Sequence, residues 1–155
     1  MTPISEKQEA SRSIIVCFHT KWQEAILHRR ISVVFRKKGP HSFRPDFLYA
    51  YLTRPFSAVI ARMSIDEYGT RSVKDALRLV KGGLLTEDEL RAYASTPFAP
   101  VYSELVVYIV SKIQVARSPI SMLTMRERWG YWPSATYTPL ADDAKTIVDE
   151  LGCFE

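Results

Sequence analysis

The sequence predicts one compact mixed α/β domain of the α+β class, and three observations lead to that expectation. The chain has 155 residues, of which 46% are hydrophobic and 25% charged, and these are the proportions of a globular domain with one core. Short β-branched apolar runs alternate with stretches of helical periodicity. Two predicted strands are separated only by a short turn, which joins antiparallel strands rather than the strands of a doubly wound parallel sheet.

The composition also limits the location and the chemistry of the protein. No apolar run reaches the roughly 18 residues of a membrane-spanning helix. Residues 1–12 carry charges of both signs and lack the apolar stretch of a signal peptide. We therefore expect a flexible leader over residues 1–12, a cytoplasmic location and no membrane partner. Cys17 and Cys153 are too few for a disulfide framework, and no Cys and His cluster has metal-ligand spacing. We expect two ordinary thiols, no metal and no cofactor.

The first third of the chain predicts a strand, a helix and a second strand. Residues 13–18 form a short β-branched apolar run, which is typical of a buried strand. Residues 21–29 carry apolar side chains at helical spacing, and Thr20 stands where it can cap this helix. Residues 31–36 alternate between two faces, as a strand does, and end in an arginine.

The middle of the chain predicts a hairpin followed by a helical insert. Residues 46–53 and 56–65 have the composition of strands, and the short turn between them pairs them antiparallel. The insert spans about residues 71–97. Within it, Thr86 followed by Glu89 is a capping box that begins a helix.

The last third of the chain predicts one more long strand and two helices. Residues 103–115 are the strongest strand candidate, and we expect Pro119 to break it. A short helix over residues 121–128 and a turn-rich stretch over residues 130–139 follow. A closing helix is expected over residues 141–151.

Positive charge is concentrated near the beginning of the chain. Residues 1–45 hold nine Lys or Arg and three acids, a balance of +6, whereas residues 46–155 hold twelve and fourteen, a balance of −2. Such a basic segment is typical of a surface that faces phosphate, although a solvated charged face has the same composition.

Three segments in this order resemble the ASCH-like domains of the PUA-like superfamily. Residues 14–36 are similar to the opening strand, helix and arginine-ended strand of these domains. Residues 47–65 are similar to their hairpin, and residues 105–137 to their late strand, Pro-Ile turn and aromatic segment. The resemblance implies a PUA-like β-barrel with flanking helices and a helical insert, formed by a single domain over residues 13–155.

The chain departs from the family where hydrolase members carry their chemistry. The family pattern after the first helix is approximately Ile-x-x-Gly-x-Lys-x-x-Glu-x-Arg. Ile26 and Arg36 match this pattern, but Arg29 replaces the glycine, Ile31 the lysine and Val34 the glutamate. Isoleucine and valine cannot serve as nucleophile, base or proton carrier. We therefore expect no catalytic residue and no enzymatic activity.

The resemblance and the basic segment together imply a regulatory module that binds RNA or a nucleotide, including one with a modified base. Cations would hold phosphate, and aromatic rings would stack on bases. Local explanations also remain open, since a charged strand end keeps an edge exposed to water and aromatic rings pack in cores. The candidate ligand-binding residues are His19, Lys21, Trp22, Arg36, Lys37, Lys38, Trp132, Ser134 and Tyr137.

Two alternative functions remain open from the sequence. The first is a hydrolase or ribonuclease that acts on a modified nucleoside or RNA through residues outside the family pattern. The residues available for it are His19, Glu24, Asp46 and Glu104. The second is a regulatory module that contacts a protein partner through the helical insert.

Overall fold

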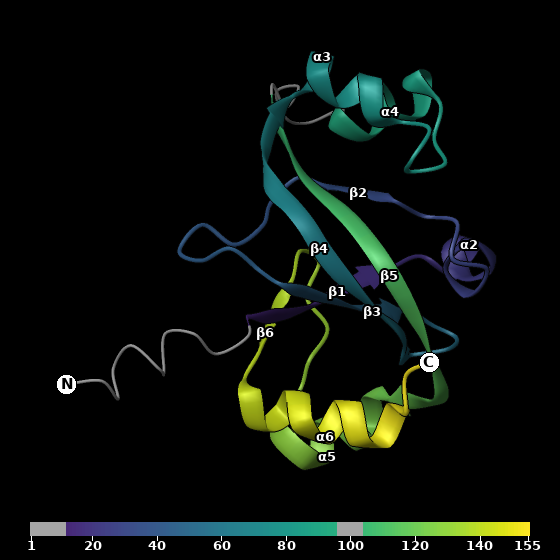
Figure 1. Ribbon diagram of the computed structural model, residues 1–155, viewed down its shortest axis with the longest axis vertical. Helices are drawn as coiled ribbons and strands as arrows, with labels where there is room; N and C mark the ends of the chain where they lie inside the picture. Colours follow the sequence, from purple (N-terminus) through teal and green to yellow (C-terminus); the bar gives the residue numbers. More distant parts are fainter. Residues whose placement is uncertain (1–11, 96–103) are drawn as a thin grey trace.

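A mixed sheet of six strands forms the centre of the structure, a computed structural model that describes residues 12–95 and 104–155 (Figure 1). The strands follow the order β2-β5-β4-β3-β1-β6 across the sheet. Their bounds are Ser13–Phe18 for β1, Val33–Arg36 for β2, Phe47–Leu52 for β3, Ala58–Ser72 for β4, Glu104–Ser121 for β5 and Thr138–Leu140 for β6. Most of the predicted leader and the end of the predicted insert, with Pro97, lie outside the described residues.

The pairing of the strands confirms the predicted hairpin and the mixed α/β class. β3 and β4 pair antiparallel, as do β4 with β5, β2 with β5 and β1 with β6. The pair β1 and β3 is parallel, with Ser13 opposite Phe47 and Phe18 opposite Leu52. β1 is therefore an inner strand, and this explains its nearly continuous apolar sequence.

The closed barrel that the resemblance implied is not confirmed. β2 and β6 are the two edges of the sheet, and no pairing joins them in the part of the chain that the structure describes. Both edge strands are short, and β6 contains Pro139, which has no N–H to donate to a neighbouring strand. β6 also covers only Ser13–Ile15 of β1, so the second half of β1 has a free edge.

β5 is longer than the sequence predicted, and the expectation that Pro119 breaks it is wrong. The strand runs to Ser121 because its pairing with β4 is irregular here: Val59 lies opposite Ile120, but Ala61 lies opposite Val115. The extra β5 residues form a bulge in which a proline costs no ladder hydrogen bond.

Helical segments lie at both ends and on one side of the sheet (Figure 1). The expectation that Thr20 caps the first helical segment is wrong. The capping residue is His19, whose Nδ1 accepts a hydrogen bond from the N–H of Lys21. The predicted capping box of Thr86 and Glu89 is confirmed.

No helix within residues 12–95 and 104–155 has the length and apolar content needed to cross a membrane. The segments are η1 Thr20–Trp22, α2 Gln23–Leu27, α3 Val73–Ala76, η2 Leu77–Leu79, α4 Glu87–Ala94, α5 Met122–Trp129 and α6 Asp142–Gly152.

Three apolar clusters hold these elements together. The largest lies among β1, β3, β4, β5 and α2, and a second joins β1 and β3 to α5 and α6. The third packs the helical insert on β2 and β5, through Val33 and Phe35 on one side and Leu90 on the other. The chain comes very close to β2 at Gly82 and Gly83, where an added Cβ would lie 2.7 Å from carbon atoms of Val33 and Phe35. The insert is thus bound to the edge strand β2.

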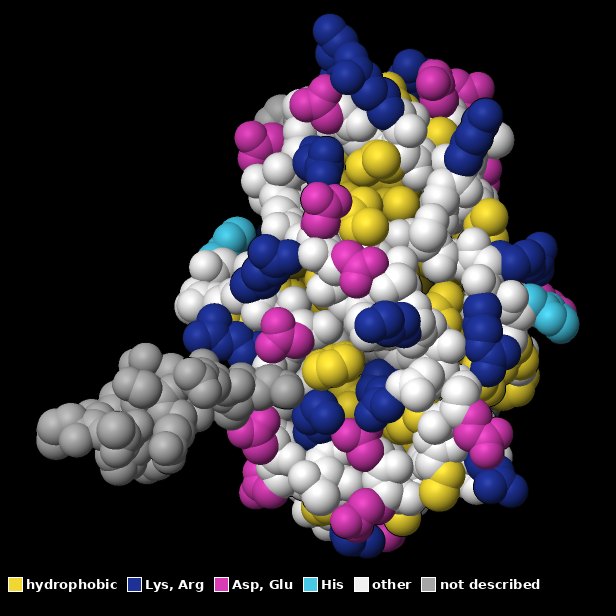
Figure 2. All heavy atoms as spheres, in the orientation of Figure 1, with side chains coloured by type: hydrophobic (Ala, Val, Ile, Leu, Met, Phe, Trp, Pro, Cys, Tyr) yellow, Lys and Arg dark blue, Asp and Glu magenta, His cyan; other side chains and the backbone are white. Residues whose placement is uncertain are grey.

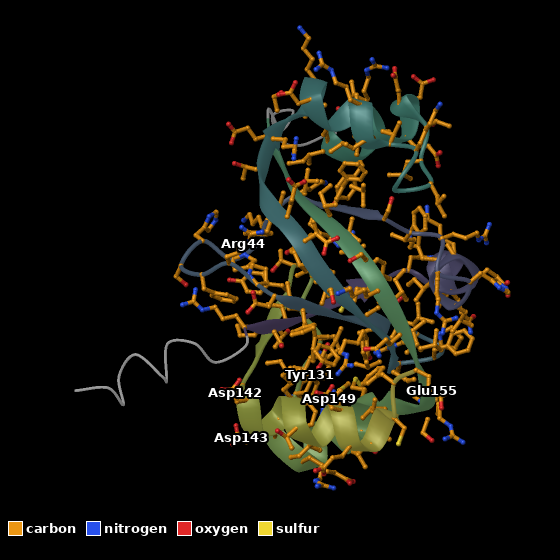
Figure 3. All side chains as sticks on the ribbon, viewed as in Figure 1. Arg44, Tyr131, Asp142, Asp143, Asp149 and Glu155 are labelled. Carbon is orange, nitrogen blue, oxygen red and sulfur yellow. The ribbon has the colours of Figure 1, made fainter. Side chains whose placement is uncertain are left out.

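A polar network fastens α6 to the sheet. The carboxylate of Asp149 accepts a hydrogen bond from the Tyr49 hydroxyl at 2.6 Å, and it forms ion pairs with Arg62 at 3.0 Å and Lys145 at 2.8 Å. Arg62 also donates to the side chain of Gln114 on the neighbouring strand. Figure 3 shows Asp149 on the side of α6 that faces the sheet. Three donors from three elements therefore depend on one carboxylate.

Replacing this carboxylate should destabilise the fold. We expect Asp149→Ala to lower the free energy of unfolding by about 2–3 kcal/mol, because partly buried Arg62 and the buried hydroxyl lose their acceptor. Urea denaturation followed by circular dichroism measures the change. The control is Glu150→Ala on the exposed side of the same helix, which should change the unfolding free energy by less than about 0.5 kcal/mol. Equal effects of the two substitutions would contradict the proposed role of Asp149.

Candidate functional site

A pocket of about 540 Å³ lies between η1, the edge strand β2 and helix α4. Its walls are mainly apolar, with aromatic rings from three of these elements. Residues from both faces of β2 line it, since β2 has no further strand on its outer side. The aromatic lining residues are Phe18, Trp22, Phe35 and Tyr93, and the charged ones are Lys21, Arg36 and Glu89.

Arg36 is positioned by backbone carbonyl groups of two strands. Its Nη1 donates to the carbonyl of Phe35 at 2.6 Å, and its Nη2 donates to the carbonyl of Cys17 at 2.8 Å. The guanidinium carbon lies 4.7 Å from the centre of the Phe18 ring. Cys17 belongs to the half of β1 that β6 leaves uncovered, so Arg36 reaches from the edge of the sheet to this free strand edge. Two of its five N–H donors are used in this way.

The charge of Arg36 has no counterion within the described residues. The side chain forms no ion pair there, and burial lowers its pKa from the ordinary value, an effect that Tyr93, Tyr108 and Cys17 oppose. A guanidinium nevertheless stays protonated at physiological pH. A partly buried cation without a carboxylate is unfavourable, and an anion in the pocket would compensate it. The lining thus combines one buried positive charge with aromatic surfaces.

The other charged residues in and beside the pocket are Lys21, Glu89 and Lys37. Lys21 Nζ lies 5.4 Å from the centre of the Trp22 ring, and Lys37 Nζ lies 5.0 Å from the centre of the Tyr93 ring. Glu89 accepts a hydrogen bond from the N–H of Thr86, and this bond lowers its pKa, so Glu89 stays ionised. Outside the pocket, Lys and Arg side chains are interspersed with Asp and Glu on the face that Figure 2 shows.

The structure brings together only part of the predicted ligand-binding set. Lys21, Trp22 and Arg36 line the pocket, and Lys37 contacts the lining residue Tyr93. His19 caps η1, the segment that carries Lys21 and Trp22. Lys38 is exposed.

The three candidates from the segment after α5 lie elsewhere. Trp132 is stacked on Arg126 of α5, with the guanidinium carbon 3.4 Å from its ring centre. The backbone of Ser134 lies against the thiol of Cys17, whose pKa is raised by burial. Tyr137 packs against the largest apolar cluster.

Sequence reasoning missed the contribution of the insert to the pocket. Helix α4 supplies Glu89, Ala92 and Tyr93, and the chain before it supplies Leu85. One signal was available, since Tyr93 is the sole aromatic residue of the predicted insert 71–97. Its position beside Arg36 depends on how the insert packs on β2, which no local pattern reveals.

The alternative catalytic residues do not form a constellation. Glu24 bonds to His28 at 3.1 Å, Asp46 accepts from the N–H of Arg12 at 3.1 Å, and Glu104 is exposed at the start of β5. None of them, nor His19, lines the pocket. Over residues 12–95 and 104–155 there is no group of three or more His, Cys, Asp or Glu that could hold a metal ion.

Comparison of the sequence with protein-family models and with curated proteins finds no match. Comparison with solved structures does find relatives of the fold. The crystal structure of ASCH from Zymomonas mobilis superposes with a TM-score of 0.78 at 19% sequence identity, over 92% of this chain and 96% of that one. A serine-to-alanine mutant of the same protein gives the same values. The N-terminal domain of Staphylothermus marinus McrB superposes with a TM-score of 0.60 at 10% identity, over 92% and 95% of the two chains.

This likeness extends over nearly the whole chain, whereas the sequence identity is low. It therefore concerns the order and arrangement of the elements described above. The chain therefore has the fold of ASCH from Zymomonas mobilis.

Proposed function

We propose that this ASCH-like domain binds RNA or a nucleotide in the pocket beside Arg36, as a regulatory module without catalytic activity. The observation that carries the proposal is the guanidinium of Arg36, which lines an aromatic pocket and has no ion pair in the described chain. A phosphate group is the anion that a guanidinium with free N–H donors binds well.

The walls of the pocket suit the rest of a nucleotide. Trp22 and Tyr93 lie on opposite elements, η1 and α4, and offer aromatic surface on which a base can stack. The volume of about 540 Å³ falls within the range of small-ligand sites. Because aliphatic side chains form much of the lining, a base with an apolar modification is also compatible with the pocket.

The absence of catalysis is supported by two lining residues. Ile31 and Val34 occupy the positions at which the ASCH pattern has lysine and glutamate, and both line this pocket. In this proposal, the pocket corresponds to the site at which the resemblance places hydrolase chemistry. The lysine and glutamate of the family pattern, which could serve as nucleophile and proton carrier, are replaced here by aliphatic side chains that can only pack.

Charge reversal at the opening of the pocket tests the contact with phosphate. We expect Lys21→Glu to weaken binding of a labelled single-stranded RNA and to reduce the slope of log K against log salt by about 1, because one phosphate contact is lost. Fluorescence anisotropy at several salt concentrations measures both quantities. Lys74→Glu, the same charge change on exposed α3, is the control. An identical slope for the Lys21 variant and the wild type would remove Lys21 from the site.

Arg36 is tested by removing its charge while keeping an extended apolar side chain. We expect Arg36→Met to lower affinity for a nucleotide by about 10- to 150-fold, the equivalent of one lost charge-assisted hydrogen bond. Thermal unfolding, measured in parallel, separates this effect from a loss of structure. A variant with lower thermal stability and unchanged affinity would show that Arg36 only joins β1 to β2.

A further inference from the structure

A second surface of the protein combines an open aromatic face with cations. Trp132 is 66% exposed although the guanidinium of Arg126 covers one face of its ring at 3.4 Å. The exposed area must therefore belong to the opposite face and the edges of the indole. Leu123, on the same helix as Arg126, is 63% exposed.

The turn between β3 and β4 adjoins this helix. The N–H of Met122 at the start of α5 donates to the carbonyl of Ser57 at 2.8 Å, next to Phe56, which is 49% exposed. We call Arg54, Phe56, Leu123, Arg126 and Trp132 the α5 surface.

The charge of the α5 surface is positive and uncompensated. Neither Arg126 nor Arg54 forms an ion pair within the described residues, and the buried Nε of Arg126 has no hydrogen-bond partner there. Burial raises the pKa of Tyr51, and the positive charges of Arg126 and Arg54 both oppose that rise. An anionic partner is therefore favoured at this surface.

The geometry selects one class among anionic partners. An arginine stacked on an indole forms a flat platform with a free π face, and every nucleobase can stack on such a face. The positive charge of Arg126 and Arg54 favours the phosphates that flank a stacked base. An acidic peptide would use the cations and leave the tryptophan face unused.

The α5 surface shares no residue with the pocket, but Cys17 contacts Arg36 of the pocket and the segment that follows Trp132. Arg36 of the pocket donates to the carbonyl of Cys17, and the backbone of Ser134, two residues after Trp132, lies against its thiol. The segment between α5 and β6 thus runs from the α5 surface to the free edge of β1 (Figure 1). Because the two places share no residue, contact with both requires an extended ligand.

We propose that the ligand is a single RNA strand rather than a free nucleotide, and that the stacked pair of Trp132 and Arg126 binds a second base of that strand. This inference rests on the proposed function, because the first base is the one in the pocket. It names the class of ligand for the same site, an oligonucleotide that spans two contacts.

The test compares ligands of two lengths on variants of the platform. Trp132→Ala should lower affinity for a labelled RNA of about ten nucleotides by about 5- to 150-fold, the effect of one lost base stack, and leave affinity for nucleoside monophosphates unchanged. Trp132→Phe should restore part of the affinity because it keeps a π face. Leu151→Ala, which shortens an exposed leucine of α6 outside the α5 surface, is the control.

The outcomes separate the two proposals. Loss of decamer binding in Trp132→Ala, with monophosphate binding intact, supports the second contact. If Arg36→Met weakens binding but Trp132→Ala does not, the pocket stands and the second contact is wrong. A wild-type protein that binds the decamer no more tightly than a monophosphate also overturns it. If the wild type binds neither ligand, the proposed function itself fails, and the second contact fails with it.

Discussion

The position of Arg36 depends on one constraint, the failure of the curved sheet to close. β2 and β1 are not neighbours in the sheet, and the second half of β1 has no strand on its outer side. A free strand edge presents carbonyl groups that need donors. The Arg36 side chain donates one hydrogen bond to the carbonyl of Cys17 in β1 and another to the carbonyl of Phe35 in its own strand. It thereby joins two strands that backbone hydrogen bonds do not pair. The same guanidinium lines the pocket and contributes a positive charge to it.

The helical insert forms the wall of the pocket that Arg36 lines. Without α4, the cation at the edge of β2 would face solvent, where water would screen its charge. The insert packs on β2 through its apolar side and brings Tyr93 into the lining that also contains Trp22. The close approach at Gly82 and Gly83 makes this packing possible. The same contacts that stabilise the insert therefore also raise the strength of the electrostatic interactions inside the pocket.

The other end of the sheet is held by different means. There, Asp149 of α6 accepts from Tyr49 and pairs with Arg62 and Lys145, so a polar network with matched charges fixes the helix. The contrast with Arg36 is informative. Arg62 and Lys145 pair with a carboxylate, whereas Arg36 and Arg126, at the two proposed contacts, form no ion pair in the described chain.

The sequence by itself determined the local elements and the fold class. Residues 13–18 as a strand, the hairpin and the capping box at Thr86 depend on side-chain periodicity and on bonds between near neighbours, and all were predicted. The tertiary structure decided what depends on distant partners. Pro119 lies within a strand because a register shift frees it from pairing, and the sheet stays open because its edges are short. Tyr93 joins Trp22 at the pocket while Trp132 goes to α5, since long-range packing places each ring and no local pattern encodes that packing.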